Sequence, residues 1–411
     1  MLVKHTLLYT GITIALIWSA AGCSKESATS PEELPAGAAA IHLDQSSQLI
    51  RGFGGVNMPG WIPDLTPDQI LTAFGTGEGQ IGLSILRIRV PHDPSAFALE
   101  VPAARLAHTL GAILIASPWT PPAWMKTNRN IVGGSLSDTS YASYAAHLQA
   151  FAGYMAANGA PLYAVSVQNE PDVTVSYESC DWTAAQLVRF LRQNVAAIGT
   201  RIIVPESYNF NPATADAILN DGTAAAAVDI IGGHIYGGGV RSYPLAASKG
   251  KELWMTEHLE TDTDWIGALF TATEIHDCMK AGMNAYIWWY IRRFYGPIDD
   301  DGRVTKRGWV MAQYARFVRP GCVRVNATAH PQKEIYVTAY KGGSRVIVVA
   351  INFGAAATDQ TFIVKGESVL TFKRYTTSAS KDCLAEGKIR TADSQLTVTL
   401  DPESVTTFAA E

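Results

Sequence analysis

From about Ile50 onward, short apolar runs alternate with amphipathic segments. Among the amphipathic segments, residues 140–158 repeat apolar side chains at helical spacing, and residues 182–198 follow Asp181, the expected N-cap of a helix. This alternation predicts repeated strand–helix units around a parallel sheet. The expected strands are residues 50–56, 83–90, 112–117, 162–168, 201–205, 228–234, 252–257 and 284–290.

Eight parallel units within roughly 270 residues predict an α/β fold, a (β/α)8 TIM barrel over residues 50–319, since such barrels are about 250 residues long. A doubly wound open sheet is the alternative. A barrel requires its functional side chains at the carboxyl ends of the strands. Aromatic and charged residues follow nearly every expected strand, which favours the barrel.

The pattern changes after a helix expected at residues 306–318. Residues 334–340, 345–351 and 395–400 alternate apolar and polar positions, and Gly, Asn, Asp and Ser turns separate them. They predict an antiparallel β-domain over residues 320–411. Residues 39–49 are expected to add its first strand, so that both chain ends form one antiparallel β-sandwich beside the barrel.

The N-terminus has the features of a targeting segment. Lys4 and His5 precede an apolar run, and the small residues from Ser19 to Cys23 resemble a bacterial lipoprotein signal. We therefore expect a signal over residues 1–23, lipidation of Cys23, a flexible tether over residues 24–38, and a location in the cell envelope. A plain secretory signal and an uncleaved anchor are the alternatives.

The composition limits the classes of molecule that the protein is expected to bind. The net charge of −5 argues against a nucleic-acid binder. The 10 Trp and 16 Tyr residues suit stacking on sugar rings, although they also fill large cores. No cysteine has the spacing of a zinc site; Cys322 and Cys383 form a disulfide or, as we expect, remain buried thiols.

Two carboxylates each close a short apolar strand. Glu170 stands before Pro171, through which a central strand cannot continue, and Glu257 ends the run from Leu253. A pair of carboxylates about 5–5.5 Å apart hydrolyses glycosidic bonds with retention. We expect Glu170 to be the acid/base, Glu257 the nucleophile and Asn169 a ligand of the sugar 2-hydroxyl; structural ion pairs are the alternative.

Further residues at the strand ends are candidates for substrate binding. His234 and Tyr236 are expected to orient Glu257, although a buried structural histidine is equally compatible with the pattern. Arg87, which shares a strand face with Arg89, would keep the nucleophile ionised, or would form a structural ion pair. The aromatic candidates for stacking, or alternatively for core packing, are Trp119, Trp124, Trp289 and Tyr290.

Several motifs together resemble family 30 glycoside hydrolases, and in particular their bacterial glucuronoxylanase subfamily. They are Gly52-Phe-Gly-Gly55, Ala116-Ser-Pro-Trp-Thr-Pro-Pro-Ala-Trp-Met-Lys-Thr-Asn128, Val167-Gln-Asn-Glu-Pro171, Trp254-Met-Thr-Glu-His258 and Trp289-Tyr-Ile-Arg-Arg293. The resemblance implies the barrel with its side domain, retaining chemistry by Glu170 and Glu257, and no metal or cofactor.

The resemblance also implies an endo-β-1,4-xylanase whose substrate is xylan carrying a 4-O-methylglucuronic acid branch. Arg293 and Tyr295, with Trp289 beside them, would hold the branch. Leu259 and Asp262 depart from the family pattern, which has a tyrosine and a serine in this region. The alternatives are a family 30 enzyme acting on unsubstituted xylan or on another β-linked glycan, and a non-catalytic glycan-binding lipoprotein. A monomer is expected, with membrane contact only through Cys23.

Overall fold

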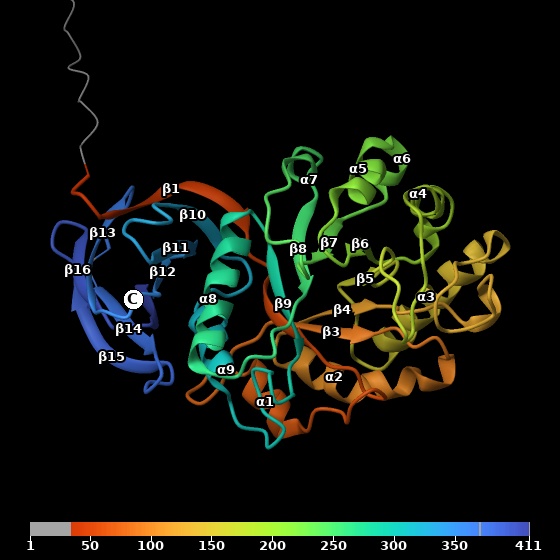
Figure 1. The fold of residues 1–411 in the computed structure, drawn as a ribbon, viewed down its shortest axis with the longest axis horizontal. Helices are drawn as coiled ribbons and strands as arrows, with labels where there is room; N and C mark the ends of the chain where they lie inside the picture. Colours follow the sequence, from red (N-terminus) through yellow and green to blue (C-terminus); the bar gives the residue numbers. More distant parts are fainter. Residues whose placement is uncertain (1–33, 370, 411) are drawn as a thin grey trace, which may run out of the picture. The chain divides into compact units, whose positions relative to one another are not determined.

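The structure, a computed structural model, describes residues 34–369 and 371–410. Eight parallel strands close into a barrel in chain order (Figure 1). Strand β2 pairs with β3 on one side and with β9 on the other, so the open-sheet alternative is wrong. The barrel strands are β2 (Gly52–Val56), β3 (Ile85–Arg89), β4 (Ile113–Ser117), β5 (Ala164–Ser166), β6 (Arg201–Ser207), β7 (Ile230–His234), β8 (Glu252–Glu257) and β9 (Ala285–Tyr290).

Helices follow the barrel strands and cover the outside of the barrel. Their caps explain where several of them begin: Thr183, and not Asp181 as expected, caps α4, and Gln186 completes a capping box with it. The helices are α1 (Pro67–Phe74), α2 (Val101–Thr109), α3 (Tyr141–Ala157), α4 (Ala184–Gln193), α5 (Pro212–Asn220), α6 (Gly222–Ala226), α7 (Pro244–Ser248), α8 (Trp265–Lys280) and α9 (Lys306–Ala315), with short 3-10 turns at Pro94–Glu100, Ala123–Met125, Asp138–Ser140 and Val195–Ala197.

A second, mostly antiparallel sheet contains strands from both ends of the described chain. Strand β1 lies between β10, to which it is antiparallel, and β13, to which it is parallel. The order across the sheet is β15-β14-β17-β12-β11-β10-β1-β13-β16. The strands are β1 (Ala39–Leu49), β10 (Val323–Ala327), β11 (Ile335–Gly342), β12 (Arg345–Asn352), β13 (Thr358–Lys365), β14 (Thr371–Thr377), β15 (Leu384–Arg390), β16 (Gln395–Leu400) and β17 (Ser404–Ala410).

The side sheet folds over on itself. Phe362 on β13 and Phe408 on β17 are separated by four strands in the ladder, yet their ring centroids are 5.4 Å apart. Register shifts in β1, between His42 and Leu49, mark one place where the sheet bends. The two facing layers of the expected sandwich are therefore parts of one continuous hydrogen-bonded sheet.

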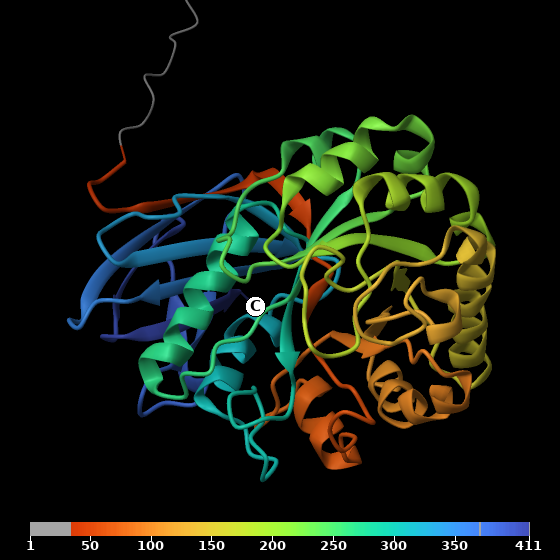
Figure 2. The same ribbon diagram turned by 45° about the vertical axis from the view of Figure 1, so that its right-hand side comes forward.

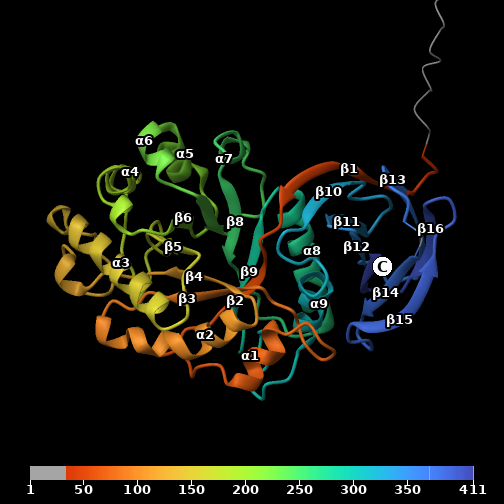
Figure 3. The same cartoon turned by 180° about the vertical axis from the view of Figure 1, so that it is seen from behind.

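Helices α8 and α9 lie between the barrel strands and the side sheet (Figures 2 and 3). The Gln313 side chain on α9 donates to Thr377 Oγ1 at 2.8 Å, and Thr407 Oγ1 donates to the Gln313 carbonyl at 2.6 Å. These buried polar contacts, with the apolar residues around them, fix the barrel against the sheet.

Two expectations from the sequence concern the termini and the cysteines. The predicted signal, Cys23 and most of the predicted tether lie outside the described residues. Within residues 34–369 and 371–410, none of the helices has the length and apolar character needed to cross a bilayer. Cys322 and Cys383 are both free and buried, as expected.

Candidate active site

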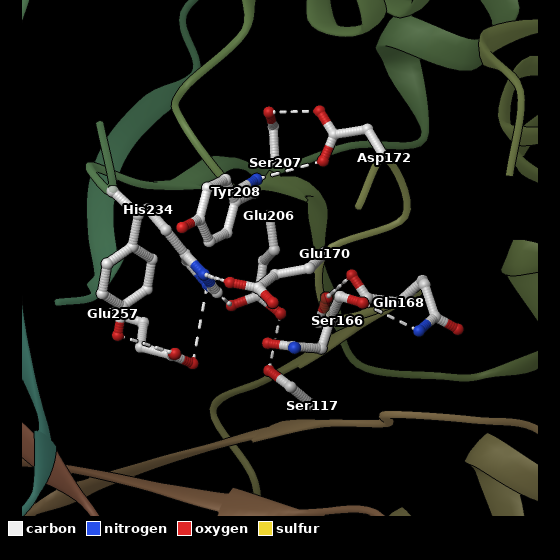
Figure 4. A network of polar contacts seen from close by, with 12 residues as sticks. Ser117, Ser166, Gln168, Glu170, Asp172, Glu206, Ser207, Tyr208, His234 and Glu257 are labelled. Atoms are coloured by element: carbon white, nitrogen blue, oxygen red, sulfur yellow. Dashed lines mark hydrogen bonds and ion pairs between the residues drawn. The ribbon is translucent and has the colours of Figure 1, made fainter. Parts of the chain in front are cut away.

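Glu170 and Glu257 meet at the carboxyl end of the barrel. Glu170 follows β5 and Glu257 ends β8. Both side chains are nearly buried, and one oxygen of each lies within 4.8 Å of the other and of a His234 ring nitrogen. Figure 4 shows these three side chains converging, with Glu206 beside them. The fold thus brings together the two carboxylates that the sequence singled out.

The backbone at Glu170 is held in a left-handed conformation, with φ 46°. Its N–H donates to the carbonyl of Glu206 at 3.0 Å, and the Gln168 side chain donates to the carbonyl of Trp119 at 2.8 Å. A non-glycine residue in this region is strained, and surrounding contacts must hold it there. These bonds direct the Glu170 side chain into the barrel mouth rather than along the strand.

His234 makes its hydrogen bond to Glu170, whereas its interaction with Glu257, the expected partner, is a longer ion pair. Its Nδ1 lies 2.8 Å from Glu170 Oε1, whereas its Nε2 lies 3.9 Å from Glu257 Oε2, beyond hydrogen-bond distance. Burial lowers the pKa of His234, but the negative charge of Glu257, the hydrogen bond to Glu170 and the Glu206 carboxylate 4.0 Å away outweigh burial and raise the pKa to about 9. His234 is therefore a cation in a ring of carboxylates.

Arg87 and Tyr236 hold Glu257. Arg87 Nη1 lies 2.6 Å from Glu257 Oε2, and the Tyr236 hydroxyl donates to Oε1 at 3.1 Å. Burial raises the pKa of Glu257, and the positive charges of His234 and Arg87 oppose that rise. The fully buried guanidinium of Arg87 also donates to Asn169 Oδ1 at 2.6 Å, so Arg87 positions both neighbours.

Glu206 is a third buried carboxylate that the sequence analysis missed. Arg87 Nη2 lies 3.1 Å from its Oε1, and Ser117 Oγ donates to its Oε2 at 2.6 Å. Burial raises the pKa of Glu206, but Arg87, His234 and Ser117 together lower it to about 2. The signal was present, because Glu206 follows an apolar strand and a proline, but the expected strand ends at Pro205, whereas β6 continues through Glu206 to Ser207.

Aromatic rings surround the two carboxylates in a cavity of about 380 Å³. Trp119 and Trp289, both expected here, have ring centroids 5.8 Å apart. Trp61, Tyr177 and Tyr208 were missed, because they lie in loops that have no periodic pattern. The cavity is lined by Trp61, Trp119, Glu170, Tyr177, Tyr208, Tyr236, Glu257, Leu259, Trp289 and Tyr290.

Trp124 lies apart from this cavity. Its side chain is 62% exposed and lines a separate hollow of about 500 Å³. Trp124, expected with Trp119 and Trp289 among the rings that stack on sugars, therefore does not share their cavity.

Arg293 and Tyr295 lie next to the cavity rather than in its lining. The guanidinium carbon of Arg293 is 6.0 Å from the ring centroid of Tyr290, which does line it. Arg293 is exposed, and Tyr295 is 8% exposed. Arg292 instead donates to the Pro63 carbonyl at 2.8 Å, which is a structural contact.

The two residues that depart from the family pattern separate in space. Leu259 lines the cavity that contains Glu170 and Glu257. Asp262 lines a neighbouring hollow of about 600 Å³ together with Glu260 and Glu274. The carbonyl oxygen of Asp262 accepts a hydrogen bond from Arg307 at 2.7 Å, which fixes that part of the loop.

Two groups of three side chains in the described part of the chain have the ligand atoms and spacing of a metal site. In the first, Glu170, His234 and Glu257, the guanidinium of Arg87 already lies against Glu257. In the second, His276, Asp277 and His330, the Lys280 ammonium lies 3.1 Å from His330 Nε2 and 3.2 Å from Asp277 Oδ1. A protein cation thus already contacts each group.

Comparison with known proteins gives the family. Residues 95–251 match the glycosyl hydrolase family 30 TIM-barrel domain. The chain is 42% identical over 392 residues to the glucuronoxylanase XynC of Bacillus subtilis strain 168, covering 92% of each chain. The chain belongs to glycosyl hydrolase family 30.

Solved structures of family 30 agree with the fold. A family 30 subfamily 8 xylanase, Xyn30A, from Clostridium acetobutylicum superposes with a TM-score of 0.88 at 41% identity, over 92% of this chain and 100% of that one. A family 30 endoxylanase from Clostridium papyrosolvens has a TM-score of 0.85 at 36% identity, over 91% and 100%. The predicted family and fold class are confirmed, and the protein is a glycoside hydrolase.

Proposed function

We propose that the protein hydrolyses β-1,4-xylosidic bonds within the main chain of (4-O-methyl)glucuronoxylan with retention at the anomeric carbon. The carrying observation is that the Glu170 and Glu257 carboxylates approach within 4.8 Å inside an aromatic-lined cavity. Retaining enzymes need closely spaced carboxyl groups, whereas inverting enzymes leave about 6.5–9.5 Å for a water molecule. Similarity to the glucuronoxylanase, the xylanase Xyn30A and the endoxylanase supports xylan as the substrate.

In the first step, a Glu257 oxygen bonds to the anomeric carbon as the glycosidic C–O bond breaks. Protonated Glu170 gives its proton to the leaving oxygen, so the released chain departs as an alcohol. In the second step, Glu170 takes a proton from water, the water oxygen bonds to the anomeric carbon, and Glu257 leaves as a carboxylate. The two displacements restore both residues and retain the configuration.

The surroundings of Glu257 favour its role as the nucleophile. Arg87 supplies a permanent positive charge at 2.6 Å, and the hydroxyl of Tyr236 donates a hydrogen bond to the other oxygen. Both contacts stabilise the ionised form. The partner of Glu170 is different, because its Oε1 lies 2.8 Å from His234 Nδ1 and no arginine among the described residues forms an ion pair with it.

Asn169 and the aromatic rings are proposed to bind the sugars. Asn169 Oδ1 is occupied by Arg87, which directs the amide N–H groups of Asn169 away from Arg87. Those N–H groups are suited to donate to a sugar 2-hydroxyl, a contact that strengthens in the transition state. Trp119 and Trp289 offer ring faces on which the apolar faces of xylose units stack.

Arg293 and Tyr295 are proposed to read the glucuronate branch, with Trp289 beside them. An exposed guanidinium binds a carboxylate through two parallel hydrogen bonds. Asp262 lies in the neighbouring hollow with Glu260 and Glu274, so its charge belongs to a separate group of acids. Leu259 supplies no hydroxyl, and hydrolysis of unsubstituted xylan is therefore the second candidate function.

Replacing each carboxylate in turn tests the chemistry. Glu170→Gln and Glu257→Gln should each abolish the release of reducing ends from glucuronoxylan, while a fold-matched variant such as Tyr154→Phe on the outside of α3 keeps wild-type rates. Proton NMR of the first product should show the β-anomer. Activity in either Gln variant, or the α-anomer as first product, would contradict the mechanism, and binding without any hydrolysis would favour the glycan-binding alternative.

Export and lipidation are proposed from the sequence of residues 1–23. If Cys23 carries a lipid, the protein expressed in a bacterium that processes lipoproteins should partition with membranes. Cys23→Ser should release it into the soluble fraction. Equal partitioning of both forms would contradict the anchor.

A further inference from the structure

A second hollow lies close to the catalytic cavity, and Trp124 is exposed on its wall. The hollow has a volume of about 500 Å³ and is lined by His92, Asp93, Pro94, Pro122, Ala123, Trp124, Met125 and His147. Trp124 is the most exposed of the large apolar side chains in the described part of the chain, at 62%. The exposed indole offers the hollow a flat apolar ring face on which a sugar ring can stack.

A single ion-paired ridge links the two cavities. Glu178 lies at the centre of the ridge: its Oε1 is 3.0 Å from Arg89 Nη1 and 3.7 Å from His92 Nε2. His92 lines the second hollow, and the chain neighbour of Glu178, Tyr177, lines the catalytic cavity. Arg89 also faces the ring of Trp61, which lines the catalytic cavity, at 5.9 Å. The linings of the two cavities are therefore joined through the contacts of Arg89, Glu178 and His92.

The loop that carries Trp124 is fixed rather than loose. Trp124 lies in a 3-10 turn, Ala123–Met125, that directly follows Pro121 and Pro122. The buried Lys126 ammonium donates to Thr120 Oγ1 at 2.9 Å and to the carbonyl of Ser179, which joins the loop to the segment after β5. A ligand that stacks on Trp124 thus loses little free energy to ordering the protein.

The polar groups of the hollow favour a neutral sugar over an acidic one. The Ser95 N–H donates to the Asp93 carboxylate and lowers the pKa of Asp93, so this carboxylate is ionised at neutral pH. The negative charge repels a uronate but accepts hydrogen bonds from hydroxyl groups. The apolar surface of Pro122, Trp124 and Met125 complements the carbon–hydrogen face of a pyranose ring.

We propose that Trp124 forms a distal subsite that stacks on an unsubstituted xylose unit of the same xylan chain, across the Arg89–Glu178–His92 ridge from the catalytic carboxylates. The subsite deepens the proposed function and rests on it. It predicts that the enzyme gains affinity for chains long enough to reach from Glu257 to Trp124.

The test is the dependence of kcat/KM on chain length. Wild type, W124A and W124F are assayed on linear xylooligosaccharides of increasing length and on polymeric xylan. The ratio of wild-type to W124A kcat/KM should rise with length to about three- to tenfold on the polymer, the range expected for one aromatic stacking contact. The change should appear mainly in KM, and W124F, which keeps an aromatic face, should recover most of the loss.

Binding gives a readout that does not need turnover. In the Glu257→Gln background, W124A should weaken binding of long oligosaccharides, measured by calorimetry, by the same factor. A ratio that does not change with length, or W124F as impaired as W124A, would overturn the subsite. Failure of the proposed function would give a different result: the wild type would hydrolyse neither the oligosaccharides nor polymeric xylan.

Discussion

The backbone N–H of Glu170 donates to the carbonyl oxygen of Glu206 at 3.0 Å, and both residues have left-handed backbone, with φ 46° and 51°. Neighbouring strands β5 and β6 thus end in the same strained geometry, one carboxylate reaching the cavity and the other lying fully buried. Arg87 contacts Glu206, Glu257 and Asn169. The buried Glu206 carboxylate therefore holds in place the guanidinium that contacts Glu257 and Asn169.

Glu206→Gln should lower both stability and activity. The folded-state pKa of about 2 lies below the ordinary value of 4.5, so the ionised carboxylate stabilises the fold above pH 4.5, and that stability is lost as pH falls toward 2. The contribution is on the order of 3 kcal/mol. Urea denaturation across pH 2–6 should show a flatter acid dependence in the variant, and kcat on xylan should fall.

Glu100→Gln is the matched control for that measurement. Glu100 is as buried as Glu206, but burial raises its pKa well above the usual range. Well below pH 4.5 this carboxyl is protonated in both the folded and the unfolded chain, so over that acid part of the range the variant should keep the wild-type dependence of stability on pH. An unchanged acid slope in Glu206→Gln would contradict the ionised buried carboxylate.

His234 should make the protein less stable at alkaline pH. Its folded-state pKa of about 9 lies above the ordinary 6.5, so the imidazolium stabilises the fold fully below pH 6.5, and this stability is lost as pH rises through 9. The loss is on the order of 3 kcal/mol. His234→Gln should remove the slope of the unfolding free energy between pH 6.5 and 9.

His276→Gln provides the contrast for His234. His276 is also buried, but burial and neighbouring cations lower its pKa to about 3, so it does not titrate between pH 6.5 and 9. This variant should keep the wild-type alkaline slope even if its overall stability falls. A slope that survives in His234→Gln would show that the histidine is neutral in the folded protein.

The barrel was predictable because each parallel strand is buried on both faces and appears as an apolar run. The expected strand 252–257 coincides with β8, whereas β5 is only three residues long, Ala164–Ser166, within the expected run 162–168. Strand ends depend on the ladder partners, which the local pattern does not contain. Glu170 and Glu257 were predictable for the same reason. Each stands at the carboxyl end of an apolar run, Glu170 after β5 and Glu257 at the end of β8.

The surroundings of those two carboxylates were less predictable. Trp61 and Tyr177 come from irregular loops and meet only in space, with ring centroids 5.9 Å apart. His234 was expected to orient Glu257, but the geometry at the end of β7 gives its hydrogen bond to Glu170 and leaves only a 3.9 Å ion pair to Glu257. Trp119 and Trp124 were both expected to stack on sugars, but two consecutive prolines lie between them and Trp124 lines another hollow.

Tyr236→Phe should lower kcat about 10- to 100-fold, the range for one hydrogen bond to a charged group. The change removes the hydroxyl that donates to Glu257 at 3.1 Å and keeps the ring, which stacks on Tyr208 at 5.1 Å. Loss of the donor also disfavours the ionised form of Glu257, so the acid limb of the pH–rate profile should move to higher pH. An unshifted acid limb with reduced kcat would instead indicate a role in shaping the cavity.

Arg293→Ala should reduce kcat/KM on glucuronoxylan by about 10- to 100-fold and leave the rate on linear xylan nearly unchanged, since a charge-assisted contact to a uronate is lost only on the branched substrate. Arg292→Ala is the matched control: the neighbouring arginine donates to the Pro63 carbonyl, so its removal should affect stability but not the preference between the two substrates. Mass spectrometry of the products adds a second readout, because cleavage directed by the branch leaves one acidic group on each oligosaccharide. If Arg293→Ala and Arg292→Ala both keep the substrate preference of the wild type, Arg293 does not read the branch. Hydrolysis of unsubstituted xylan would then be favoured, in agreement with the absence of a hydroxyl group at Leu259.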